Sequence, residues 1–155
     1  MKNHYKQGLS IIEIIVAVAI LGIIFLVVIP QFSKIRDNQV IKSAVQDTLS
    51  AIDKARTETL SSLNSSEYGV HFQSDQVIIF KGKVFSAGDA NNEIFGITAP
   101  ASITNVTFGG TSGVSGDIYF NRLSGAPSTT GTITISNNSF SKIITISATG
   151  VASVN

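Results

Sequence analysis

The spacing of hydrophobic residues changes twice along the chain and predicts three regions. Residues 14–29 contain no charged or strongly hydrogen-bonding side chain, and residues 9–13 add only Ser10 and Glu13 as polar positions. A helix over residues 9–29 would rise about 31 Å, roughly the thickness of the hydrocarbon core of a bilayer. Since every face of that helix would be apolar, the run predicts a helix that is associated with a membrane.

Residues 31–63 show a helical period instead. Apolar side chains recur there at steps of three to four residues, with charged side chains mostly between them. The pattern lacks the sustained heptads of a coiled coil, so we expect this stripe to pack on the chain's own sheet. The apolar positions of the stripe are Phe32, Ile35, Ile41, Val45, Leu49, Ile52, Ala55 and Leu60.

From residue 67 onward the period becomes two, which predicts a β-rich body over residues 67–155. A first pair of strands is expected at Tyr68–Phe72 and 77–80, on either side of a turn at residues 73–75, and further strands are expected at 93–98, 103–108 and 117–120. The segments 132–136 and 140–147 alternate around Asn137 and Asn138, which indicates a hairpin, and a last edge strand covers 151–154. The glycine-rich residues 109–116 are expected to form a flexible loop. The predicted fold class is α+β: a long N-terminal helix packed on a C-terminal antiparallel β-domain.

Composition narrows the functional classes. The chain has 155 residues, with eleven Lys and Arg against ten Asp and Glu, which argues against a nucleic-acid binder. It contains no cysteine, so disulfides, thiolate nucleophiles and cysteine metal sites are excluded. Neither His71, in a predicted strand, nor the glycine-rich segment 109–116 offers a catalytic or phosphate-binding pattern. We expect no enzyme activity, no cofactor, no metal and no small-molecule substrate.

The polar residues 1–8, with Lys2 and Lys6, resemble the basic leader of a targeting segment. The apolar run that follows can be cleaved at either of two positions or can remain uncleaved. A signal peptidase could cut after the Ala17-Val18-Ala19 pattern, but that would leave a strongly apolar mature terminus. The run could remain as an uncleaved single-pass anchor. Alternatively, a cut between Gly8 and Leu9 would leave the whole apolar helix on the mature protein.

Glu13 bears on the last two alternatives. A charged side chain at the centre of a bilayer costs about 3 kcal/mol and normally has a partner. Cleavage after Gly8 would create an α-amino group on Leu9, with an unperturbed pKa of about 8 and so largely cationic at neutral pH. That amine on a neighbouring molecule could pair with Glu13. An acid that merely lies near the membrane interface and extends toward the headgroups is the other physical interpretation.

The segment Gly8-Leu9-Ser10-Ile11-Ile12-Glu13, with its basic leader and the apolar run behind it, resembles the prepilin cleavage motif of type IV pilins and type II secretion pseudopilins. This resemblance implies that a prepilin peptidase cuts between Gly8 and Leu9 and that Leu9 becomes N-methylated. It also implies that Glu13 is the residue that directs assembly. The chain departs from the usual pattern at Leu9, where phenylalanine is most common.

Gly22 and Pro30 weaken the helix on physical grounds. Glycine costs about 1 kcal/mol relative to alanine inside a helix, and proline lacks the N–H that would bond the carbonyl of Leu26. Both positions also match those where pilin helices carry a glycine and a bending proline. We therefore expect the helix to stretch or partly unwind at these points when it is packed in a filament.

The C-terminal part, IYFNRLSGAP…GTITIS…FSKIITISATGVASV, resembles the β-domain of minor pseudopilins of the GspH/FimT-like group. Members of that group often carry a basic residue after the glycine of the last turn, where this chain has Val151 and Ala152 after Gly150. Together the two resemblances predict a minor pilin or pseudopilin with a leader (1–8), a membrane and filament-core helix (9–30), an amphipathic helix (31–63) and a head (67–155).

The resemblance implies a location and partners. The chain would span the bacterial inner membrane once, with its head outside the cytoplasm, and then enter a pilus or pseudopilus. Its partners would be the prepilin peptidase and other pilin or pseudopilin subunits, contacted through the N-terminal helix. The alternative from another class is an uncleaved single-pass membrane protein that displays a ligand-binding β-domain.

Overall fold

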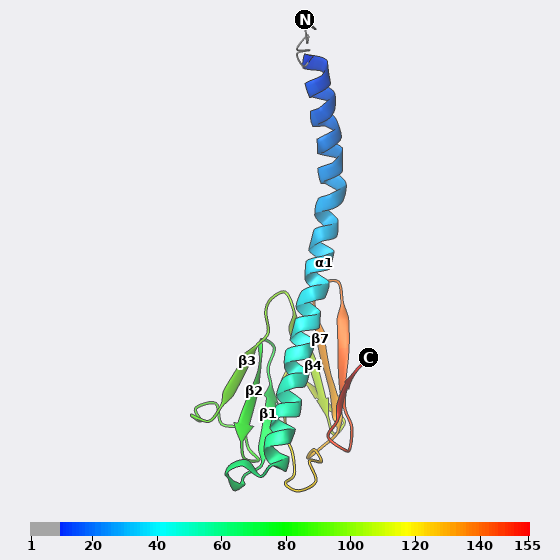
Figure 1. Cartoon of the computed structure of the whole chain (residues 1–155). Coiled ribbons are helices and arrows are strands. Elements are labelled where there is room, and N and C mark those ends of the chain that lie inside the picture. The colour runs from blue at the N-terminus through cyan, green and yellow to red at the C-terminus, as the bar shows by residue number, and fades with distance from the viewer. Residues whose placement is uncertain (1–9) are drawn as a thin grey trace, which may run out of the picture. The chain divides into compact units, whose positions relative to one another are not determined.

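The computed structural model describes residues 10–155, and only the backbone of residues 29 and 30. Its longest element is helix α1, Ile11–Leu60 (Figure 1). The chain divides into two compact units within this helix, Met1–Arg36 and Asp37–Asn155. We describe each unit by itself.

The described part of the first unit is helical from Ile11 onward. Its large apolar side chains from Ile11 to Val28 are all exposed, with exposed fractions between 39% and 78%. Within the described residues, α1 is the one helix that is long and apolar enough to cross a membrane. Gly22 and Pro30 both lie inside α1, whose backbone is helical at the two positions.

The second unit contains the rest of α1, a short 3₁₀ helix η1 (Leu63–Ser65) and two antiparallel sheets. The first sheet has the strand order β3-β2-β1-β6 and the second has the order β5-β4-β7-β8-β9. The strands are β1 (Tyr68–Phe72), β2 (Gln76–Lys81), β3 (Glu93–Gly96), β4 (Ser102–Phe108), β5 (Thr111–Gly113), β6 (Gly116–Tyr119), β7 (Gly131–Ser136), β8 (Ser141–Ile146) and β9 (Ala152–Val154). The fold is therefore α+β, as the sequence predicted.

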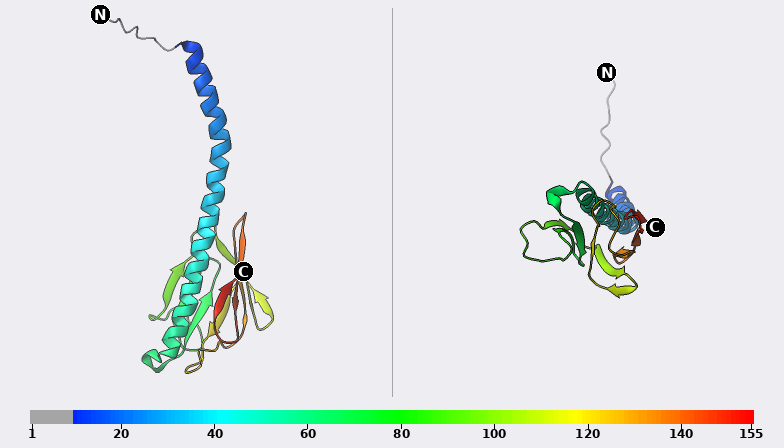
Figure 2. Two further views of the ribbon diagram at one scale, coloured as in Figure 1. Left: turned by 45° about the vertical axis from the view of Figure 1, so that its right-hand side comes forward. Right: turned by 90° about the horizontal axis from the view of Figure 1, so that it is seen from below.

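The C-terminal part of α1 packs across both sheets, as Figure 2 shows from two sides. Ile41, Ile52 and Ala55 are at most 2% exposed and join one core cluster with strand residues such as Val70 and Ile133. The predicted stripe is thus confirmed from Ile41 to Ala55, and it contacts the chain's own sheets. Phe32, Ile35 and Leu60, the ends of the stripe, are exposed.

Two expectations about local structure were wrong. The segment 109–116 is not a flexible loop, because β5 pairs with β4 there and β6 begins at Gly116. Gly109 and Gly110 both have positive φ, 58° and 85°, which a tight two-residue hairpin turn requires. The helix also ends at Leu60 rather than near Leu63, because Ser62 adopts a left-handed conformation with φ 52°.

The strand pairs on either side of the chain reversals follow the predicted pattern. β1 and β2 pair antiparallel from Tyr68↔Lys81 to Phe72↔Val77, and β7 and β8 pair across the Asn137 turn. β1 is buried along its whole length, on both faces. The core cluster covers one face, and the loop that follows β2 covers the other, as described below.

Candidate functional site

The apolar N-terminal part of α1 is the principal candidate site. A helix in water normally shows a polar face, yet here the exposed apolar side chains surround the helix from Ile11 to Val28. An apolar surface of this extent is stable only against lipid or against other apolar helices. The segment can therefore act as a membrane anchor and as a packing element.

Glu13 lies in the first turn of α1, as the only acidic residue of that turn. The carbonyl oxygen of Ser10 accepts hydrogen bonds from the backbone N–H groups of Glu13 (3.1 Å) and Ile14 (3.2 Å), so Ser10 stands at the N-cap. Ser10 and Glu13 have the spacing of a capping box. Local structure thus explains why a carboxylate is tolerated at this end of the helix.

The helix terminus does not by itself account for a charge in a membrane. An exposed acid gains about 0.3–1 kcal/mol from the dipole at a helix N-terminus, whereas burial at the bilayer centre costs about 3 kcal/mol. Glu13 is exposed in the described structure. A buried Glu13 would therefore need a cationic partner from outside its own described turn.

The other predicted site positions are only partly described. Gly8 and Leu9, which flank the expected cleavage point, lie outside the described residues. At Gly22 an added Cβ would meet no heavy atom within 4 Å, so contacts within the chain do not demand a glycine there. Pro30 is part of α1, and the structure describes its backbone alone. The weakening of the helix at these two positions stays a prediction.

His71 belongs to a different cluster, which sequence reasoning did not foresee. Its Nδ1 bonds the Oδ1 atom of Asp117 on β6, and its ring stacks on Phe85 with a centroid distance of 3.9 Å and an interplanar angle of 4°. Phe85 also meets the edge of Phe80 at 5.7 Å. This stacking places the loop after β2 over the outer face of the first sheet, where it contacts His71 and Phe80.

The carboxylates of Asp89 and Glu93, near β3, each accept hydrogen bonds from other residues of the chain. The carboxylate of Asp89 accepts hydrogen bonds from the backbone N–H (2.8 Å) and the side-chain amide (2.7 Å) of Asn91, which lower the pKa of Asp89 from its ordinary value. Glu93 pairs with Lys54 at 2.6 Å. Within residues 10–155, no three His, Cys, Asp or Glu side chains gather as they would around a metal ion.

Comparison with known protein families gives two matches, one to the N-terminal region of the chain and one to the rest. Residues 44–150 match the family described as type II transport protein GspH. This match covers well over half of the chain. Residues 3–29 match the prokaryotic N-terminal methylation motif. No curated protein and no solved structure matches the chain significantly.

The family match lies on the amphipathic part of α1 and the two sheets, and the motif lies on the leader and the apolar run. The GspH family is structural rather than enzymatic. A membrane-length apolar helix, a processing motif in front of it and a β-rich head behind it are the parts of a pseudopilin. The chain belongs to the GspH family of type II transport proteins, as a pseudopilin with a prepilin-type N-terminal motif.

Proposed function

We propose that the chain is a structural subunit of a type II secretion pseudopilus or a related type IV pilus-like filament. The observation that carries this proposal is the helix from Ile11 to Val28, whose apolar side chains are exposed on all sides and which has one acid in its first turn. Such a segment is suited to two environments in turn: lipid before assembly, and a bundle of like helices afterwards.

Processing comes first in this account. A prepilin peptidase cuts between Gly8 and Leu9, and the new amino group of Leu9 is methylated. The subunit then stays in the inner membrane through residues 9–30, with its head outside the cytoplasm. The methylation motif that covers residues 3–29 supports this sequence of events.

Assembly then depends on Glu13. Lipid tails are as apolar as neighbouring helices, so moving the helix from the bilayer into a bundle yields little hydrophobic free energy. Packing fit and specific polar contacts must then decide the outcome. Pairing of Glu13 with the cationic terminus of Leu9 on an adjacent subunit neutralises two charges and sets the axial offset between the helices.

The test compares Glu13→Ala with the wild type in cells that contain the peptidase and the assembly machinery. The variant should be cut at Gly8 as usual but be absent from the assembled fraction, because the carboxylate is needed only after processing. Ser10→Ala is the matched control, since it removes the other polar side chain of the segment and keeps the acid. Normal incorporation of Glu13→Ala would refute the assigned role.

A further inference from the structure

Two segments with left-handed backbone meet at one end of the second unit. Arg122 Nη1 donates a hydrogen bond of 2.9 Å to the carbonyl oxygen of Ser65, which joins the loop 121–126 to the turn after α1. In the described part of the chain, every non-glycine residue with positive φ lies in these two segments: Ser62, Asn64, Ser65 and Leu123. Left-handed backbone is disfavoured for residues that carry a side chain, so this end of the head holds a costly conformation.

Leu123 is the most unusual of these residues. Its φ is 72°, and its side chain is 88% exposed, the highest fraction among the large apolar side chains that the structure describes. The loop around it is closed by two backbone hydrogen bonds, Asn121 N–H to Ala126 O (2.8 Å) and Gly125 N–H to Asn121 O (2.9 Å). We call Arg122 and Leu123 the knob. It presents one aliphatic side chain and one guanidinium in a preset geometry.

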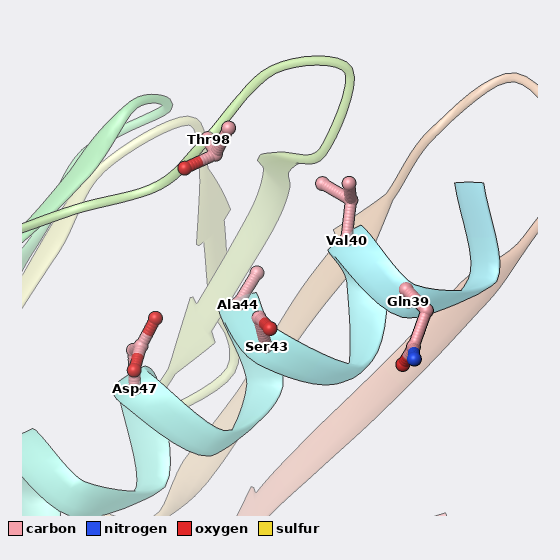
Figure 3. A pocket seen from close by; sticks show the side chains of 6 residues that line it. All are labelled: Gln39, Val40, Ser43, Ala44, Asp47 and Thr98. Atoms are coloured by element: carbon pink, nitrogen blue, oxygen red, sulfur yellow. The ribbon is translucent and has the colours of Figure 1, made fainter. Parts of the chain in front are cut away.

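A groove of about 220 Å³ lies near the other end of the same unit, beside α1. Figure 3 shows Val40, Ala44 and Asp47 projecting from the helix on the side where Thr98 lies. Small and apolar side chains form its floor, and Asp47 supplies a carboxylate at its rim. We call this the Asp47 groove; its lining residues are Gln39, Val40, Ser43, Ala44, Asp47 and Thr98.

The knob and the Asp47 groove cannot meet within one molecule. Ser43 lines the groove, and Leu60 packs at the other end of the unit against Gly125, next to the knob. The helix between these two residues rises about 26 Å. A contact between the two surfaces therefore joins two copies head to tail. Such a heterologous contact can repeat from copy to copy and forms an open filament unless the rotation between copies closes it into a ring.

Charge distinguishes this groove from a second one. A groove of about 290 Å³ on the other side of α1 also has an apolar floor, but two lysines, Lys42 and Lys142, line it. The guanidinium of Arg122 would be repelled there, whereas the Asp47 groove offers it a carboxylate. We propose that the knob of one copy occupies the Asp47 groove of a second copy, with Leu123 over Val40 and Ala44 and with Arg122 paired to Asp47.

This inference rests on the proposed function, because the contact is small. A stable interface between separate molecules usually buries more than about 1,000 Å², and one knob in one groove buries much less. Copies held side by side through their N-terminal helices meet at a high effective concentration, which makes a weak contact effective. The test must therefore use the full chain in its membrane.

Because the chain contains no native cysteine, every disulfide within or between its copies must form between introduced cysteines. The full chain with Ser43→Cys and Leu123→Cys is oxidised in membranes that contain the peptidase and the assembly machinery. Because each copy then carries both cysteines, we expect a ladder of dimers, trimers and longer products. The matched control is Gln46→Cys with Leu123→Cys, since Gln46 lines the lysine groove. It should give several-fold less product, as should either Ser43→Cys or Leu123→Cys alone.

A charge exchange tests the ion pair. Arg122→Glu in the Ser43→Cys, Leu123→Cys background should reduce the ladder several-fold, and adding Asp47→Arg should restore it. Restoration excludes misfolding as the cause of the loss. Equal products from the two cysteine pairs, no ladder, or a cross-link only to a different protein would each overturn the inference.

The intact mass of the same preparation separates the two proposals. A chain that begins at Leu9 and enters the assembly without forming the ladder rejects the head-to-tail contact and leaves the proposed function standing. A chain that still begins at Met1 rejects the processing on which the proposed function depends.

Discussion

Arg56 Nε donates a hydrogen bond of 3.2 Å to the carbonyl oxygen of Gly125, at the point where two distant turns of the head approach each other. Gly150, in the turn before β9, lies against the same guanidinium and the same carbonyl. Val151 and Ala152, which follow this glycine in the sequence, carry no charge. Arg56 thus brings a cation from α1 to the corner where the turns that contain Gly125 and Gly150 meet.

The close packing at this corner predicts that adding one methyl group at Gly150 strongly lowers the free energy of unfolding. Gly150 has φ +81°, and a Cβ there would lie 2.2 Å from the Gly125 oxygen. Strained backbone and overpacking together should lower the free energy of unfolding of Gly150→Ala by about 3 kcal/mol. Gly88→Ala is the control, since an added Cβ meets nothing within 4 Å, and its effect should stay within about 1 kcal/mol. Equal denaturation midpoints for the two variants would contradict this packing.

The stack of Phe85 on His71 predicts where the head opens locally. Phe85→Ala removes the ring that covers the outer face of the first sheet, so the loop after β2 should open roughly tenfold more often. Limited digestion with trypsin, followed at Lys81 and Lys83, measures this opening. Val84→Ala is the control, because Val84 is 81% exposed and should leave the rate unchanged. A Phe85→Ala protein cut no faster than wild type would show that the stack does not hold the loop.

The lowered pKa of Asp89 predicts how the stability of the head depends on pH. The backbone N–H of Asn91 and then its side-chain amide stabilise the carboxylate, so the pKa of Asp89 lies below its ordinary value of 3.8. A lowered pKa means that the contribution to stability is present above pH 3.8 and is lost as the pH falls through the folded-state pKa. Asn91→Ala keeps the backbone donor, so the pKa of Asp89 should rise only part of the way back. NMR titration of the Asp89 carboxyl carbon checks this, and an unchanged pKa would exclude the amide as a cause.

The helix-weakening positions predict a pattern of amide exchange. If Gly22 and Pro30 let the helix stretch in an assembled filament, backbone amides of residues 22–30 should exchange faster than those of the flanking helix. Hydrogen exchange on assembled material, followed by mass spectrometry, compares this segment with residues 41–55. Ordinary helical protection throughout residues 22–30 would rule out the stretching.

Local pattern was sufficient for much of this fold. The apolar run, the stripe from Ile41 to Ala55 and the turns between paired strands follow from periodicity within short windows. The two hairpins around Ser74 and Asn137 were predictable because each is a contact between neighbours in sequence. Glu13 stood out as a candidate because a lone acid in an apolar run is costly.

Other features depend on partners far away in the sequence. β6 returns to pair with β1, which brings Asp117 to His71, and no short window contains both residues. The same holds for the ring of Phe85 that stacks on His71 and for the hydrogen bond from Arg122 Nη1 to the Ser65 carbonyl oxygen. β5 was missed because it has only three residues, Thr111–Gly113, within a glycine-rich segment, and its pairing depends on the glycine turn before it.

In the proposed function, the apolar helices can assemble only after cleavage has exposed a new terminus at Leu9, close in sequence to Glu13. The intact mass of the protein purified from cells with an active prepilin peptidase shows whether this cleavage takes place. We expect a chain that begins at Leu9 and is heavier than the unmodified sequence by one methyl group. A chain that retains Met1 and the rest of residues 1–8 in those cells would contradict it.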